Sequence, residues 1–192
     1  MLGFIRIGII SSALGLLGAV AHAADAVAPY GARPSGVFIS EFRLGVFAHD
    51  PVSPESGSAD VNGEVLFAKP FAAGGWLSDL LIPRLHIGGT ANFAGKTSHA
   101  YAGLTWTYDF TQQLFVEGSL GGGVNSGKAG LFPVPGHNAM GCNWNFRESA
   151  SAGYRFAQQW SLMGTVEHMS NAGLCTRNRG LTNYGLRLGY SF

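Results

Sequence analysis

From residue 37 onward, apolar and polar side chains alternate with a period of two, which indicates β-strands with two different faces. The alternation is clearest at the C-terminal end of the chain. One face there carries Tyr184, Leu186, Leu188, Tyr190 and Phe192, and the other carries Asn183, Gly185, Arg187, Gly189 and Ser191. A strand with one apolar and one polar face lies between two different environments.

The pattern predicts an all-β fold, an eight-stranded antiparallel transmembrane β-barrel. Segments of about ten residues that are apolar outward and polar inward are typical of such barrels. The predicted strands are Val37–Ala48, Asp60–Lys69, Leu81–Phe93, Ser98–Phe110, Gln113–Asn125, Asn143–Phe156, Trp160–Met169 and Thr182–Phe192.

The connections between these segments differ in length. Asp109–Gln112 and Ala157–Gln159 are tight turns, whereas Ser126–Cys142 and Ser170–Leu181 are long loops. Short turns at one end and long loops at the other match the periplasmic and extracellular ends of an outer-membrane barrel. Pro70–Leu80 is longer than a periplasmic turn of this kind requires.

The charged residues decide between a membrane barrel and a soluble lipocalin-like barrel, whose interior would be apolar. Only 12 % of the residues are charged, about half the share of a soluble domain. By parity the charges oppose the apolar rows and face the interior: Glu41, Arg43, Glu64, Arg84, Glu117, Arg147, Arg155, Glu167 and Arg187. Mixed charges inside a narrow barrel predict a paired polar core and no conducting pore. The net charge of +1 gives no argument for nucleic acid.

The N-terminal segment 1–23 has the features of a secretory signal peptide. Arg6 precedes an apolar stretch from Ile7 to Val20, and Ala21-His22-Ala23 gives a small-x-small cleavage pattern. The alternative is a membrane anchor, but the stretch is shorter than the about 20 residues that a spanning helix needs. We expect residues 24–192 to form a single outer-membrane β-barrel domain.

The two cysteines of the predicted mature chain, Cys142 and Cys175, lie in the two long loops. In an oxidising compartment an even pair predicts a disulfide, here one that joins the loops flanking the seventh strand. Two unrelated reduced thiols are the alternative. His49, His86, His99 and His137 show no ligand spacing with these cysteines, so no metal or other cofactor is expected.

The end of the seventh strand carries the candidate chemistry. His168 and Ser170 share a face because they are two residues apart, so the imidazole can take the serine proton as a general base. Asn171 can offer an amide donor to an oxyanion. An interfacial polar pair is the alternative, but both residues fall in the outward row with Trp160 and Leu162, where polar groups are costly. Glu167 is predicted to face the lumen and to pair with Arg147 or Arg187.

The segments His168–Leu174, Asn178–Leu181 and Leu188–Phe192 resemble the PagL-type lipid A 3-O-deacylases. Ile39–Asp50 also resembles the first strand of related chains. The resemblance implies an outer-membrane barrel that hydrolyses the 3-position ester of lipid A. It implies His168 as base, Ser170 as nucleophile and Asn171 as oxyanion donor. The family places a glutamate early in the last strand to orient the histidine, and the corresponding residue here is Thr182.

Hairpin geometry suggests a replacement for this glutamate. If Ala157–Gln159 is a turn, Phe156 pairs with Trp160, and a constant register pairs Glu148 with His168. We therefore expect Glu148 to orient His168, with Thr182 as a possible substitute at the acid position. A solvated interfacial carboxylate is the alternative reading of Glu148.

Three functions follow from these features. The first is an esterase acting on lipopolysaccharide in the outer leaflet through an acyl-enzyme intermediate. The second is a non-catalytic barrel with a structural or adhesive role, and the third is a binding barrel whose loop Ser126–Cys142 contacts an outside partner. The terminal strand, which ends in Phe192, resembles the signature read by the barrel-assembly machinery, so that machinery and the membrane are the other expected partners.

Overall fold

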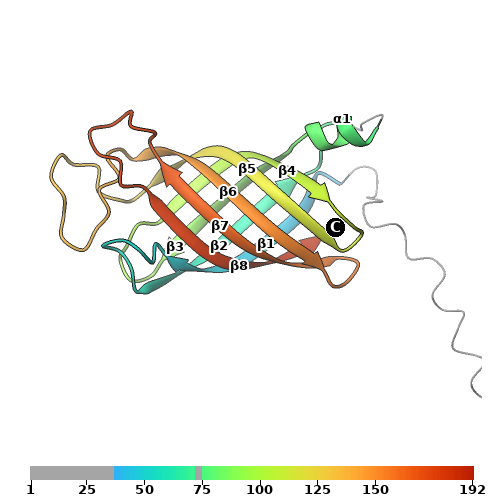
Figure 1. The fold of residues 1–192 in the computed structure, drawn as a ribbon, viewed down its shortest axis with the longest axis horizontal. Coiled ribbons are helices and arrows are strands. Elements are labelled where there is room, and N and C mark those ends of the chain that lie inside the picture. Colours follow the sequence, from blue (N-terminus) through green and yellow to red (C-terminus); the bar gives the residue numbers. More distant parts are fainter. Residues whose placement is uncertain (1–36, 72–74) are drawn as a thin grey trace, which may run out of the picture.

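The computed structural model describes residues 37–71 and 75–192 and consists of one closed β-barrel with a short helix at one end (Figure 1). The predicted signal peptide lies outside the described residues. The elements in chain order are β1 (Ile39–His49), β2 (Ser58–Phe67), α1 (Trp76–Leu81), β3 (Arg84–Asn92), β4 (His99–Asp109), β5 (Leu114–Asn125), β6 (Trp144–Arg155), β7 (Trp160–Ser170) and β8 (Leu181–Ser191).

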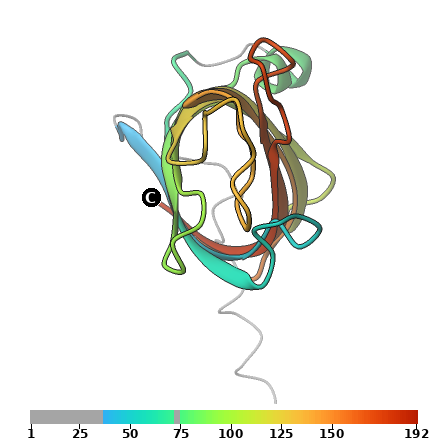
Figure 2. The same ribbon diagram turned by 90° about the vertical axis from the view of Figure 1, so that its left-hand side faces the viewer.

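Every strand pairs antiparallel with its neighbours in sequence, and β1 pairs with β8 to close the ring (Figure 2). Val46 lies opposite Leu186 at this closing seam. The predicted eight-stranded antiparallel barrel is therefore confirmed. Most strand ends lie within two residues of the predicted positions, because the two-residue alternation continues to the ends of the paired segments.

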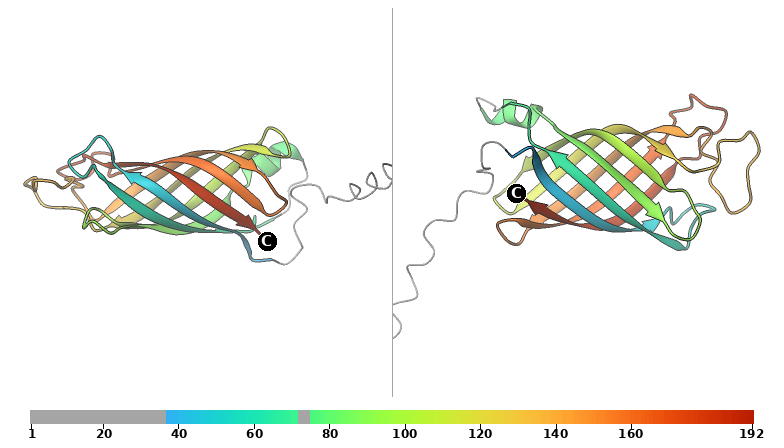
Figure 3. Two further views of the ribbon diagram at one scale, coloured as in Figure 1. Left: turned by 90° about the horizontal axis from the view of Figure 1, so that it is seen from below. Right: turned by 180° about the vertical axis from the view of Figure 1, so that it is seen from behind.

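The third strand is the exception. It begins at Arg84, and Leu81, which was expected to open it, is the last residue of α1. The helix occupies part of the connection that is too long for a simple turn, and Figure 3 shows it at the end of the barrel that holds the C-terminus. Pro83 separates helix from strand, as expected for a residue without a backbone N–H. Among the described residues no helix is long and apolar enough to cross a bilayer.

The lumen is filled with paired charges, as the parity of the sequence predicts. Arg43 contacts Glu41 at 2.8 Å and Glu117 at 2.8 Å. Glu167 contacts Arg147 at 2.9 Å and Arg187 at 3.5 Å, so both of its predicted partners are found. These side chains are at most 7 % exposed, which makes the interior a packed ionic core.

The outer wall is apolar. Leu44, Val46, Leu186 and Leu188 are between 41 % and 61 % exposed although they belong to the centre of their strands. Apolar side chains outside and charges inside are the reverse of a soluble barrel and match a wall that faces lipid.

Three of the loops at the end opposite to the C-terminus, 50–57, 93–98 and 126–143, are tied together by the buried carboxylate of Glu55. It accepts hydrogen bonds from His49 Nε2 at 2.8 Å, from the Thr97 backbone N–H at 3.0 Å and from the Asn138 backbone N–H at 2.9 Å. His137 Nδ1 lies 3.4 Å away. Burial raises the pKa of Glu55, but the hydrogen bonds from His49, Asn138 and Thr97 outweigh it and lower the pKa to about 2. One ionised side chain thus joins three loops.

Candidate active site

His168 and Ser170 stand on the outer wall of β7, near the end that carries the long loops. They alternate with the buried residues Glu167 and Met169, and each is partly exposed. Strand pairing places Glu148 of β6 on one side of His168 and Thr182 of β8 on the other. The predicted register between Glu148 and His168 is therefore confirmed.

The hydrogen bond that orients His168 comes from Thr182. Its Oγ1 lies 2.8 Å from His168 Nδ1, whereas no hydrogen bond or ion pair joins Glu148 to His168. The expectation that Glu148 orients the imidazole is corrected in this respect. Of the two cross-strand neighbours of His168, it is Thr182 on β8 whose side chain reaches the ring nitrogen. If Thr182 accepts the bond, Nδ1 carries the hydrogen and Nε2 keeps a lone pair.

Gly180 leaves room for the imidazole. A Cβ atom at this position would lie 3.0 Å from His168 Cε1 and 3.3 Å from Nε2. The φ of Gly180 is +74°, which disfavours any other residue. The loop before β8 therefore packs its bare backbone against the edge of the ring that carries Nε2.

A groove of about 440 Å³ opens on the outer wall beside His168. It crosses β4 to β7, and its depth comes from small residues, because Gly118 and Ala150 are paired neighbours on β5 and β6. The groove includes His168 and Glu148 at its edge, and its largely apolar lining includes Trp106, Leu120, Ala150 and Val166. Such a surface suits a hydrocarbon chain that approaches from the bilayer.

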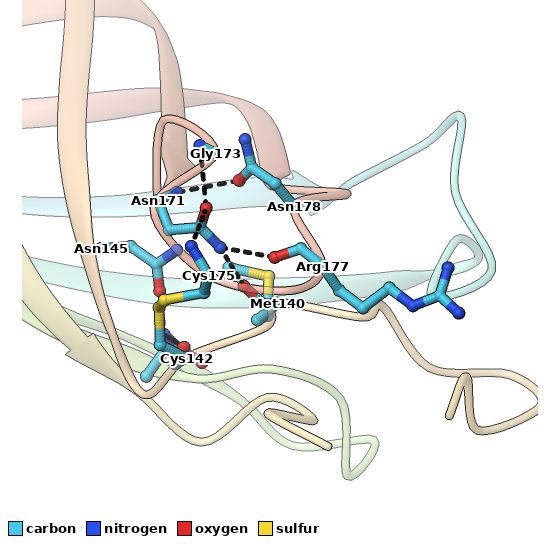
Figure 4. The surroundings of a disulfide bond; sticks show 9 residues. Met140, Cys142, Asn145, Asn171, Gly173, Cys175, Arg177 and Asn178 are labelled. Carbon is cyan, nitrogen blue, oxygen red and sulfur yellow. Dashed lines mark hydrogen bonds between the residues drawn. A yellow bond between two sulfur atoms is a disulfide. The ribbon is translucent and has the colours of Figure 1, made fainter. Parts of the chain in front are cut away.

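Asn171 does not serve in the structure as the oxyanion donor that the sequence suggests. It is fully buried, and its Nδ2 donates to Met140 O at 2.8 Å and Arg177 O at 2.6 Å (Figure 4). Its Oδ1 accepts from Gly173 N at 2.9 Å. Both amide hydrogens are used, so this expectation is corrected: Asn171 fixes the loop that follows Ser170.

Two donors other than the Asn171 side chain lie in the loop after Ser170 and have no partner within the described residues. They are Asn178 Nδ2 and the backbone N–H of Ala172. Asn178 Oδ1 accepts the backbone N–H of Asn171 at 2.9 Å, which anchors the amide and leaves its Nδ2 unbonded. The backbone N–H of Ala172 is also unbonded, and its φ is +53°. Sequence reasoning missed Asn178, although its position four residues before Thr182 lies in a segment that carries the family resemblance.

The predicted disulfide between Cys142 and Cys175 is present and joins the loop before β6 to the loop after β7. It lies directly beside Asn171, whose Oδ1 accepts from Cys175 N at 3.4 Å. The covalent bond and the amide network together hold the segment that follows Ser170.

Comparison with known proteins agrees with the fold and identifies the family. The family model "Lipid A 3-O-deacylase (PagL)" matches residues 83–191. The crystal structure of the outer-membrane enzyme PagL superposes with a TM-score of 0.61 at 20 % identity, covering 80 % of this chain and all of that one. A structure from the de novo design of transmembrane β-barrels gives a TM-score of 0.51 at 16 % identity, covering 83 % of this chain and all of that one. No match was found among curated proteins. The family match, which spans more than half of the chain, shows that this protein of the bacterial outer membrane belongs to the lipid A 3-O-deacylase (PagL) family.

Proposed function

We propose that the chain is an esterase that removes the ester-linked acyl chain from the 3-position of lipid A in the outer leaflet. Ser170 acts as the nucleophile and His168 as the general base. The observation that carries the proposal is the pair of side chains on the lipid-facing wall. Nδ1 of His168 is held by Thr182 at 2.8 Å, and Nε2 has no partner in the described part of the chain.

The chemistry follows from the tautomer that this hydrogen bond favours. Nε2 takes the proton of the Ser170 hydroxyl as the oxygen attacks the ester carbonyl. Asn178 Nδ2 and the backbone N–H of Ala172 supply the donors for the oxyanion. When the tetrahedral intermediate collapses, the sugar oxygen leaves with the proton from His168. Water then hydrolyses the acyl-serine, with His168 again as the base.

Glu148 contributes charge in this proposal. Its carboxylate lies in register with His168 at the edge of the groove and has no bonded partner within the described residues. A negative charge beside the ring stabilises the imidazolium that forms when Ser170 loses its proton. Thr182 fixes the direction of the ring, and Glu148 takes over part of the electrostatic role of the family's glutamate.

One observation favours the second candidate, a non-catalytic barrel: a hydroxyl and not a carboxylate contacts Nδ1. In serine proteases, loss of the triad acid costs about 10⁴ in rate. Activity measured on the intact chain decides between the two functions.

The test is expression in a Gram-negative host without such an activity, followed by mass spectrometry of its lipid A. We expect loss of one hydroxyacyl chain with the native sequence and none with Ser170→Ala or His168→Ala. Ser161→Ala is the matched control, because Ser161 lies on the same strand but faces the lumen. Lipid A of unchanged mass with the folded native protein would overturn the proposal.

A further inference from the structure

Three exposed cations stand without counter-charge on the loops above the candidate active site, where the half-buried Lys96 donates to Gly136 O at 2.8 Å. Lys128, Arg177 and Arg179 are exposed, and none of them forms an ion pair within the described residues. The only carboxylates in loops 50–57, 93–98, 126–143 and 171–180 are Asp50 and Glu55, which are 7 % and 0 % exposed. The solvent-facing side of these loops is therefore positive.

One short segment brings the three cations together. Lys128 forms a β-bridge with Ala139, and the Gly141 N–H donates to Lys128 O at 3.2 Å. The Arg179 N–H donates to Ala139 O at 3.1 Å. Asn171 Nδ2 donates both to Arg177 O at 2.6 Å and to Met140 O at 2.8 Å. The backbones of all three residues therefore adjoin segment 139–141 beside the disulfide, and Lys128, Arg177 and Arg179 are called the cationic platform.

The guanidinium groups of Arg177 and Arg179 are each fixed by one hydrogen bond and keep further N–H donors for a ligand. Arg177 Nε donates to Leu131 O at 3.1 Å, and its terminal nitrogens have no hydrogen-bond partner within residues 37–71 and 75–192. Figure 4 shows this side chain extending away from the residues around the disulfide. Arg179 Nη2 donates to Val52 O at 2.8 Å. A guanidinium fixed through one nitrogen retains the fork that binds two phosphate oxygens.

The cationic platform is joined to the nucleophile through the hydrogen bonds of the same loop. Asn171, the residue after Ser170, donates to Arg177 O and to the side chain of Asn178. An ester at Ser170 therefore places the rest of its lipid headgroup toward the loops, while the apolar groove runs along the wall.

From this arrangement we propose that the cationic platform of Lys128, Arg177 and Arg179 binds a phosphate group on the headgroup of the lipid whose ester reaches Ser170. The inference rests on the proposed function for the identity of the lipid. It adds a headgroup contact that the ester chemistry does not require, made by the three loop cations.

The test measures binding and not turnover. The full chain with Ser170→Ala is folded in detergent and titrated with lipid A that carries its phosphates, and with the same lipid A after removal of the phosphates. We expect the combined change Lys128→Gln, Arg177→Gln and Arg179→Gln to weaken binding of the phosphorylated lipid by about 10- to 100-fold. Binding of the dephosphorylated lipid should be unchanged.

Two variants serve as controls. Arg155→Gln removes a cation at the opposite end of the barrel, where it pairs with Asp109 at 2.7 Å, and should leave the affinity unchanged. Arg177→Lys combined with Arg179→Lys keeps the charge but loses the fork, and should give an intermediate loss. It also shows that the loops tolerate substitution.

Equal affinity for both lipids, or equal affinity of the triple variant and its parent, would overturn the inference. The inference would also be overturned if the triple change weakened binding of inorganic phosphate but not of lipid A. The natural ligand of the cationic platform would then be a free anion and not a lipid headgroup. Since the assay needs no hydrolysis, phosphate-dependent binding by a chain that leaves lipid A intact in cells would refute the proposed function and keep this inference.

Discussion

The lumen and the outer wall of β7 both carry polar side chains away from bulk water. The two regions differ in whether these side chains have hydrogen-bond and ion-pair partners. Inside, Arg43 and Glu167 each contact at least two opposite charges. Outside, Ser170 and Glu148 have no side-chain partner within the described residues, and His168 has one, Thr182. Polar groups that are fully paired hold a fold together, whereas polar groups kept unpaired beside a groove are available to a ligand.

The largest effect should come from breaking the inner set. Arg43→Met removes from the buried core the cation that contacts Glu41, Glu64 and Glu117, which should lower the free energy of unfolding by about 3–5 kcal/mol even though Arg84 still contacts Glu41 and Glu117. Urea unfolding of the barrel in lipid vesicles measures this. Leu44→Val on the lipid side of the same strand should cost less than about 1 kcal/mol. Similar losses for both variants would contradict the contrast between the two faces.

The loop cluster at Glu55 should respond to acid. Its folded pKa of about 2 is below the ordinary value of 4.5, so its stabilisation is complete above about pH 4.5 and is lost as the pH falls toward 2. At about 1.4 kcal/mol per pKa unit this amounts to roughly 3 kcal/mol of loop closure. Hydrogen exchange at Thr97 and Asn138 should rise over that range beyond its intrinsic pH dependence. Glu55→Gln should abolish this additional rise, and a rise that persists in the variant would contradict the assignment to Glu55.

A smaller effect, on the rate of deacylation, is expected at the outer site beside His168. Gly180→Ala places a methyl group 3.0 Å from His168 Cε1, which should lower kcat by about 10- to 100-fold through displacement of the base. Gly173→Ala is the matched control, because its φ of +79° imposes similar backbone strain with no atom within 4 Å of the new Cβ. Deacylation rates of the two folded variants should differ. Equal rates would show that strain alone is responsible.

The smallest effects concern the residues beside His168. Thr182→Val keeps the shape but removes the acceptor for Nδ1, and should lower kcat by about tenfold. Thr182→Glu should raise kcat above that of the native chain, because a carboxylate stabilises the imidazolium. Glu148→Gln should lower kcat by a few-fold, because the imidazolium that forms during the reaction loses a neighbouring negative charge. No change in any of these variants would remove both residues from the mechanism.

The sequence predicted the barrel well because strand pairing is a repetitive constraint. Two-residue alternation fixes which face each residue occupies, and a tight turn then fixes the partners across a hairpin. The pairing of Glu148 with His168, each nine residues from the turn Ala157–Gln159, followed from these two facts alone. The lumen charges followed from the same alternation, whereas the disulfide between the long loops was predicted from an even pair of cysteines in an oxidising compartment.

The parts that failed depend on contacts between loops, which have no such period. Asn171 seemed free to donate in the linear sequence, and only the carbonyls of Met140 and Arg177 show that its amide is occupied. Leu81 fits a strand pattern locally, but the chain there turns into α1 before Pro83. Thr182 reaches the imidazole ahead of Glu148 because of side-chain geometry that the register leaves open.

The packed lumen has a consequence for how the rate of this protein must be described. Because His168 and Ser170 look outward from a barrel whose interior is filled by ion pairs, a lipid arrives by lateral diffusion within one leaflet. The variable that governs encounter is then the number of lipid molecules per unit of membrane area. Diluting lipid A with inert phospholipid at a fixed total amount should slow turnover, whereas diluting the whole suspension with buffer should leave the turnover number unchanged.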